Sequence, residues 1–261
     1  MKLTHKLCGA ALLAAVGMAV AIPNSVKAAP GAAPAAGMDI QFTANAGDGT
    51  TNTITDGDGS GAGTVTSGLV TTDAGTFGVR AITPLKFGSD NSSASGTGRH
   101  FFAKNFVAND GEGSTDQIIA PNYVEFVDDR SELDHKYEIT AQITTELNTT
   151  VGTENTVRKL DGATLQFLNG RVKSETDVTD ALTPKEAVAT TPVTSKESTV
   201  ILNHEDAAKG RGRFKMLFGT YAAEGDTNSE KSVKLNIKDE TELFQDTNYQ
   251  GEITWSMNIL P

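Results

Sequence analysis

The chain ends in Tyr249-Gln250-Gly251-Glu252-Ile253-Thr254-Trp255-Ser256-Met257-Asn258-Ile259-Leu260-Pro261, a stretch that holds the only tryptophan of the sequence. The large apolar residues Ile253, Trp255, Met257 and Ile259 alternate with the polar residues Glu252, Thr254, Ser256 and Asn258. A period of two is typical of a β-strand that turns one face to a core and the other to solvent. The stretch therefore predicts a core strand that closes a sheet, with Trp255 facing the core and the Tyr249 hydroxyl in contact with water at the strand entrance.

Shorter segments of the same kind precede this strand. Strands are predicted at Met38–Phe42, Ala81–Phe87, Tyr123–Val127, Tyr137–Ile143, Thr164–Leu168, Val200–Leu202, Phe214–Phe218 and Val233–Ile237. They are rich in β-branched and aromatic residues and are separated by turn-forming Gly, Asn, Asp and Pro. Helical periodicity is nearly absent, with single helical turns predicted only at Thr183–Ala189 and Asp206–Lys209. We therefore predict an all-β fold, a single β-sandwich or partly closed barrel with long Gly/Asp/Thr-rich loops.

The N-terminal residues have the pattern of a secretory signal peptide. Basic residues precede an apolar run, and small residues suit cleavage after Ala28, so residues 1–28 are predicted to be removed. Residues 29–37 are rich in Ala, Pro and Gly and are predicted to form a flexible tether. The all-β domain is predicted for residues 38–261, of which residues 38–83 are rich in loops. No later apolar run is long enough to cross a bilayer, so no transmembrane segment is expected in the mature chain.

Charge and cysteine content exclude some classes of partner and of stabilising bond. The net charge is −11 over 261 residues, and cleavage would remove further lysines. Such a negative chain disfavours nucleic acid and anionic membrane as partners, so no nucleic-acid partner is expected. The one cysteine, Cys8, lies in the predicted signal peptide, so the mature domain has to be stabilised by its core rather than by disulfides.

One loop copies part of a calcium site. Asp56, Asp58 and Ser60 are spaced as in the first half of an EF-hand loop, which supplies oxygen ligands to calcium. The position that should carry a bidentate glutamate is Ser67, so a solvated Gly/Asp turn is the preferred interpretation. No metal and no cofactor is therefore expected.

Catalytic chemistry has little support in the sequence. His100, His135 and His204 have no second histidine or cysteine at ligand spacing, which argues against a zinc site. The nucleophile motif Gly-x-Ser-x-Gly is absent, although a Ser-His-Asp triad stays open because its members meet only in the fold. We predict a protein without enzymatic activity.

The segment Lys209-Gly210-Arg211-Gly212-Arg213 is the one basic cluster of the sequence. It could contact an anionic polymer such as a wall teichoic acid. The favoured interpretation is a basic turn that precedes the strand Phe214–Phe218 and pairs with nearby acidic residues, because the patch is small and the protein acidic.

Five segments follow one another in a recognisable order. They are Leu85–Gly88, Pro121–Arg130 with its Val-x-Asp-x-Arg ending, Leu160–Phe167, the glycine and aromatic residues from Gly210 to Gly219, and the C-terminal stretch Tyr249–Pro261. In this order the chain resembles the WxL-domain family of surface proteins in low-GC Gram-positive bacteria. Tyr137-Glu138-Ile139 occupies the place of the family's first Trp-x-Leu, and Met257 replaces the leucine of the second.

The resemblance implies a secreted cell-surface protein that binds non-covalently to peptidoglycan or another wall polymer. It also implies a complex with other WxL proteins and a membrane-anchored wall-binding partner. No Leu-Pro-x-Thr-Gly sorting signal accompanies the C-terminal stretch, so covalent anchoring by sortase is not expected. The alternative is a structural or adhesive subunit that assembles by β-strand addition through its C-terminal strand.

The motif positions are the candidate binding residues. They are Tyr249, Thr254, Trp255, Met257, Tyr137 and Ile139. Because Trp255 alternates with apolar neighbours, we expect the motif to be mainly a folding element that positions polar and loop residues for binding.

Overall fold

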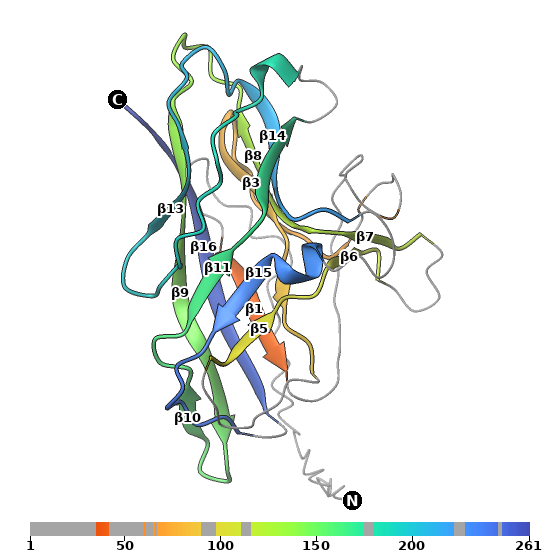
Figure 1. Cartoon of the computed structure of the whole chain (residues 1–261), viewed down its shortest axis with the longest axis vertical. Helices are drawn as coiled ribbons and strands as arrows, with labels where there is room; N and C mark the ends of the chain where they lie inside the picture. The colour runs from red at the N-terminus through yellow and green to blue at the C-terminus, as the bar shows by residue number, and fades with distance from the viewer. Residues whose placement is uncertain are drawn as a thin grey trace, which may run out of the picture.

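A computed structural model describes residues 35–41, 60, 65, 67–89, 98–110, 116–174, 180–221, 228–244 and 247–261. The predicted signal peptide lies outside these ranges. The described chain forms strands β1 to β16 and two short 3-10 helices, η1 (Asp180–Leu182) and η2 (Ser229–Lys231) (Figure 1). The predicted all-β class is confirmed, and the packed open sheets fit the β-sandwich rather than the barrel. Within these ranges, no helix has the length and hydropathy needed to cross a membrane.

The first sheet contains the C-terminal strand. Its order is β10 (Thr156–Lys159), β9 (Tyr137–Val151), β16 (Asn248–Ile259), β1 (Ala35–Gln41) and β4 (Leu85–Lys86), and β13 (Thr199–His204) also pairs with β9. β16 is antiparallel to β9 on one side and, from Asn248 to Thr254, to β1 on the other. The terminal strand therefore lies inside its sheet, whereas the sequence pattern predicted a strand that closes a sheet. β1 begins at Ala35, before the predicted start at Met38.

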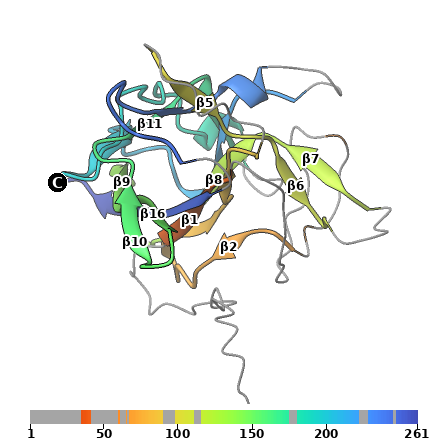
Figure 2. The ribbon, with the colours of Figure 1, turned by 90° about the horizontal axis from the view of Figure 1, so that it is seen from below.

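Two further sheets and a hairpin complete the part of the fold that the structure describes. The second sheet has the order β12 (Gly170–Ser174), β14 (Gly212–Phe218), β8 (Asn122–Asp128), β3 (Phe77–Ile82) and β2 (Val70–Thr71). The third has the order β11 (Thr164–Phe167), β15 (Val233–Asn236) and β5 (His100–Phe102), and β6 (Phe106–Ala108) pairs with β7 (Ile118–Ala120). The β6–β7 hairpin projects from the flank of the molecule (Figures 1 and 2).

The core has two parts, one on each face of the second sheet. The main part joins all three sheets and contains the largest buried aromatic residues, among them Phe126, Phe167 and Phe214. A smaller cluster on the other face packs Tyr123 and Leu217 against Phe106 of the β6–β7 hairpin. All seven residues of β8 are consequently buried, including the polar residues Asn122, Glu125 and Asp128.

Three local predictions were wrong. The predicted strand Ala81–Phe87 is two strands in two sheets, because the chain crosses between them at Pro84, which cannot donate a ladder hydrogen bond. The predicted helical turn Thr183–Ala189 is irregular and follows η1. Asp206–Lys209 is a turn closed by the Lys209 amide donating to the Asp206 carbonyl.

Candidate functional site

The two Trp-x-Leu positions of the sequence, Tyr137–Ile139 and Trp255–Met257, lie on the neighbouring strands β9 and β16. In the ladder between β16 and β9, Met257 is opposite Ile139 and Ile259 is opposite Tyr137. Residues directly opposite each other in an antiparallel pair share one face of the sheet. The segment in place of the first Trp-x-Leu and the Trp255 motif therefore form one continuous structural unit.

Trp255 stands where the three sheets meet. Its side chain is 2% exposed. Its ring lies edge-on to Phe167 of β11, with centroids 5.1 Å apart, and stacks with Phe218 of β14 at 6.1 Å. The predicted core position of Trp255 is confirmed, and the signature tryptophan has no surface to offer a ligand.

Most of the other candidate binding residues are also buried in the core. Tyr137, Ile139 and Tyr249 are fully buried. The Tyr249 hydroxyl accepts a hydrogen bond from the Phe244 amide at 3.2 Å, so the prediction that it stays in contact with water was wrong. Met257 is partly buried against the core.

Thr254 alone among the six candidates is on the solvent side. Its hydroxyl lies 2.9 Å from that of Thr144 on β9. Five of the candidate positions thus serve packing. Thr254 shares the polar face of this sheet with Thr144.

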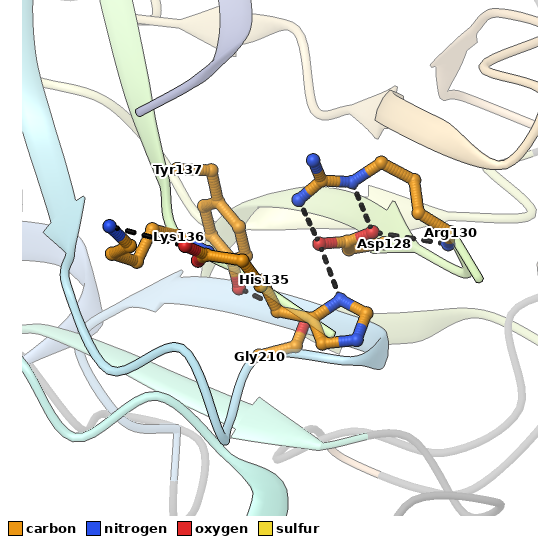
Figure 3. A network of polar contacts seen from close by, with 7 residues as sticks. Asp128, Arg130, His135, Lys136, Tyr137 and Gly210 are labelled. Atoms are coloured by element: carbon orange, nitrogen blue, oxygen red, sulfur yellow. Dashed lines mark hydrogen bonds and ion pairs between the residues drawn. The ribbon is translucent and has the colours of Figure 1, made fainter. Parts of the chain in front are cut away.

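The Val-x-Asp-x-Arg segment forms a buried charge network. The fully buried Asp128 carboxylate accepts hydrogen bonds from Arg130 Nε at 2.8 Å and Nη2 at 2.7 Å. His135 Nδ1 lies 3.0 Å from the same carboxylate. Figure 3 shows Arg130 and His135 approaching Asp128 from two sides. The Arg130 guanidinium also lies 4.4 Å from the centre of the Phe77 ring, a cation–π contact that fixes the loop against β3.

The charge state of Asp128 follows from these contacts. Burial by itself raises the pKa of a carboxyl group, but the hydrogen bonds from Arg130 and His135 outweigh it, and the pKa of Asp128 is lowered below its usual value. The carboxylate is therefore ionised throughout the physiological pH range and holds the β8–β9 connection closed.

A second buried group surrounds the start of β9. The Tyr137 hydroxyl donates to the Gly210 carbonyl at 3.4 Å, and the Tyr137 ring lies 4.9 Å from the His204 ring. His204 Nδ1 is 2.8 Å from Glu186 Oε1, within ion-pair range but outside hydrogen-bond geometry. Gly210 has a φ of 82°, and a Cβ there would lie 2.5 Å from His204 Nε2. Only glycine fits between these two side chains.

These groups have a structural rather than a catalytic arrangement. In the described ranges, no serine, threonine or cysteine side chain hydrogen-bonds to His135 or His204, so a triad is not assembled there. The described residues also contain no group of three or more metal-ligating side chains. Of the partial calcium set, Asp56 and Asp58 lie outside the described residues, and the Ser60 hydroxyl accepts a hydrogen bond from the Ile119 amide at 2.9 Å.

The basic cluster is paired with acidic residues, as the favoured interpretation predicted. Lys209 Nζ lies 2.7 Å from Asp206, and Arg213 Nε lies 4.0 Å from Asp129. Two of its three cations are thereby partly neutralised, which leaves little net positive charge for an anionic polymer.

Tyr137→Phe is expected to reduce the loss of stability in alkali. Burial raises the pKa of Tyr137 well above its model-compound value of 10.0, and the charges of Asp128 and Glu186 add to the effect. Above about pH 10 the unfolded chain ionises this tyrosine and the folded chain does not. The wild-type free energy of unfolding should therefore fall with a component of up to about 1.4 kcal/mol per pH unit that the variant lacks. Urea titrations from pH 8 to 11 measure it, and parallel curves for the two proteins would contradict it.

Comparison with known proteins identifies the family. The family model for the WxL domain, described as a surface cell wall-binding domain, matches residues 69–261. No curated protein and no solved structure matches the chain. The matched region begins just before β2 and covers the second and third sheets, the buried charge network and both motif strands. The chain therefore belongs to the WxL-domain family of surface proteins that bind the cell wall.

Proposed function

We propose that the protein is secreted and held non-covalently on peptidoglycan, within a complex that contains other WxL proteins and a membrane-anchored wall-binding protein. The observation that carries the proposal is the family match over residues 69–261, whose signature strands form the centre of the first sheet. Because Trp255 and Tyr137 are buried, the motif acts by building the domain, and wall contact belongs to its polar surface.

A protein partner is supported by apolar residues at the end of the molecule where β16 finishes. Ile259 is 59% exposed although it continues the core-facing row of Trp255 and Met257, and Leu133 in the loop before β9 is 96% exposed. The Leu260 amide donates to the Lys136 carbonyl, which places the C-terminal residues beside this loop. Contact with another surface protein would remove these two exposed apolar side chains from water.

Strand addition through β16 is the less favoured assembly. β16 is hydrogen-bonded to β9 along its length and to β1 over Asn248–Thr254. Donating it to a neighbour would open the first sheet and expose Trp255. We therefore expect the mature chain to run as a monomer over a wide concentration range, and concentration-dependent oligomers in analytical ultracentrifugation would support strand exchange instead.

Sedimentation with purified peptidoglycan tests the proposed function. The mature chain, residues 29–261, is expected to pellet with peptidoglycan and to be released intact by concentrated guanidinium chloride, because no covalent bond holds it. The supernatant should contain no newly released sugars or peptides. Protein that stays in the supernatant, or that leaves the pellet only after the wall is digested, would contradict the proposal.

A further inference from the structure

The two longest strands of the first sheet have an unusual composition on their solvent side, although the neighbouring edge strand β10 exposes Arg158 and Lys159. β9 has 15 residues and β16 has 12, and neither contains a lysine or an arginine. Their side chains that point away from the core are carboxylates, amides and hydroxyls. We call this surface the outer face and define it by Glu138, Gln142, Thr144, Glu252, Thr254 and Asn258.

Cross-strand hydrogen bonds fix the outer face. The Thr144 and Thr254 hydroxyls are 2.9 Å apart, and Asn258 Nδ2 donates to Glu138 Oε1 at 3.2 Å. The Ser198 hydroxyl donates to Gln142 Oε1 at 3.2 Å, which extends the array toward β13. Side chains held in this way lose little further freedom when they bind a ligand.

Most of the outer face is accessible to solvent, although Thr140, between Glu138 and Gln142 on β9, is buried. Thr144, Glu252 and Asn258 are exposed, and Gln142 and Thr254 are half-buried by their neighbours on the sheet. The positions of the outer face run from Glu138 to Thr144 on β9 and from Glu252 to Asn258 on β16, which is about 20 Å at about 3.4 Å per residue. β9 and β16 run along the long axis of the molecule, so the face is an elongated, rigid platform (Figure 1).

We propose that the outer face binds the glycan strand of peptidoglycan and excludes anionic wall polymers. This inference rests on the proposed function. Amide side chains both donate and accept hydrogen bonds, as do the hydroxyl and N-acetyl groups of the glycan. A polyol-phosphate polymer such as teichoic acid would meet the Glu138 and Glu252 carboxylates with no lysine or arginine from either strand to compensate, and such like-charge contact is costly.

The charges of the rest of the chain agree with this preference. The net charge is −11, and Lys209 and Arg213 of the basic cluster at the start of β14 are engaged by Asp206 and Asp129. Neither feature would draw an anionic polymer to the protein. The outer face is thus better suited to a neutral, hydrogen-bonding polymer than to an anionic one.

The test compares two double variants on two preparations of wall. Gln142→Ala/Asn258→Ala removes two amides from the outer face and keeps the Thr144–Thr254 contact. Gln166→Ala/Asn236→Ala removes two amides from the third sheet and is the matched control. The first variant is expected to bind acid-stripped peptidoglycan at least tenfold more weakly than the wild type, while the control binds as the wild type does. Melting temperatures establish that both variants are folded.

The second preparation is the same wall with its teichoic acids retained. The wild type should bind the stripped peptidoglycan more tightly at low salt, and the difference should vanish near 1 M salt, where charges are screened beyond about 3 Å. Equal binding by the folded outer-face variant and the wild type, or wild-type binding that requires teichoic acid, would overturn the inference. Failure of the wild type to bind either preparation would instead refute the proposed function.

Discussion

Trp255→Ala is expected to lower the free energy of unfolding by about 3–5 kcal/mol, the range for removing a large buried aromatic side chain. Trp255 is 2% exposed and contacts Phe167 and Phe218, which belong to the other two sheets. Its removal leaves a cavity at a point where all three sheets meet, and the strands on every side limit how far the cavity can collapse. Urea denaturation at neutral pH measures the change.

Ile259→Ala on the same strand is the matched control. Ile259 continues the same row of side chains but is 59% exposed, so its truncation should cost well under 1 kcal/mol. Wall binding distinguishes the two possible roles of Trp255. If Trp255→Ala keeps wild-type stability and loses wall binding, the tryptophan contacts the ligand and the burial argument fails. If it loses stability but binds the wall while folded, the motif is a folding element.

The periodicity of the sequence predicted the faces of the terminal strand but not its surroundings. The alternation from Ile253 to Met257 correctly indicated which side chains enter the core. It did not indicate that Ile259 is exposed, because a strand's period says nothing about where the opposing sheet ends. It also did not indicate that β16 is internal, since its neighbour β1 comes from the other end of the chain.

Strands without an apolar pattern were missed. All four residues of β10 are exposed, and it exists because it continues a hairpin from the long strand β9. Pairing of this kind depends on tertiary context more than on intrinsic preference. The short strands β2, β5, β6, β7 and β12 were missed as well, and β6 and β7 are apolar but too short to show a period.

The buried charge network was only partly accessible from sequence. The segment ending in Asp128 and Arg130 was identified by its resemblance to the family, and His135 follows within the same loop, so the three could have been grouped by proximity alone. The contact of Tyr137 with His204 and Gly210 could not, because about 70 residues separate them. Gly210 was assigned to a basic cluster, whereas its lack of a side chain is what the fold uses.

Asp128→Asn is expected to cost about 3 kcal/mol of stability at neutral pH, because it leaves Arg130 and His135 buried without their carboxylate. The side chains of both partners are at most 10% exposed, so water replaces the lost contacts poorly. The neutral amide can still accept one hydrogen bond, but it cannot balance the charge of the guanidinium. The loop between β8 and β9 would then loosen around Phe77.

The pH dependence separates charge loss from a packing defect. Because the pKa of Asp128 is lowered in the folded state, its contribution to stability is complete above the usual carboxyl pKa of 3.8 and is lost as the pH falls toward the folded-state value. The wild type should therefore lose stability in acid through this group, the variant should not, and the two unfolding curves should converge below about pH 4. Asp134→Asn, in the same loop but paired with Lys136 at the surface, is the matched control and should remain close to the wild type at neutral pH. If the difference in the free energy of unfolding between Asp128→Asn and the wild type stays constant down to pH 2, packing and not the ionised carboxylate holds this end of the sandwich together.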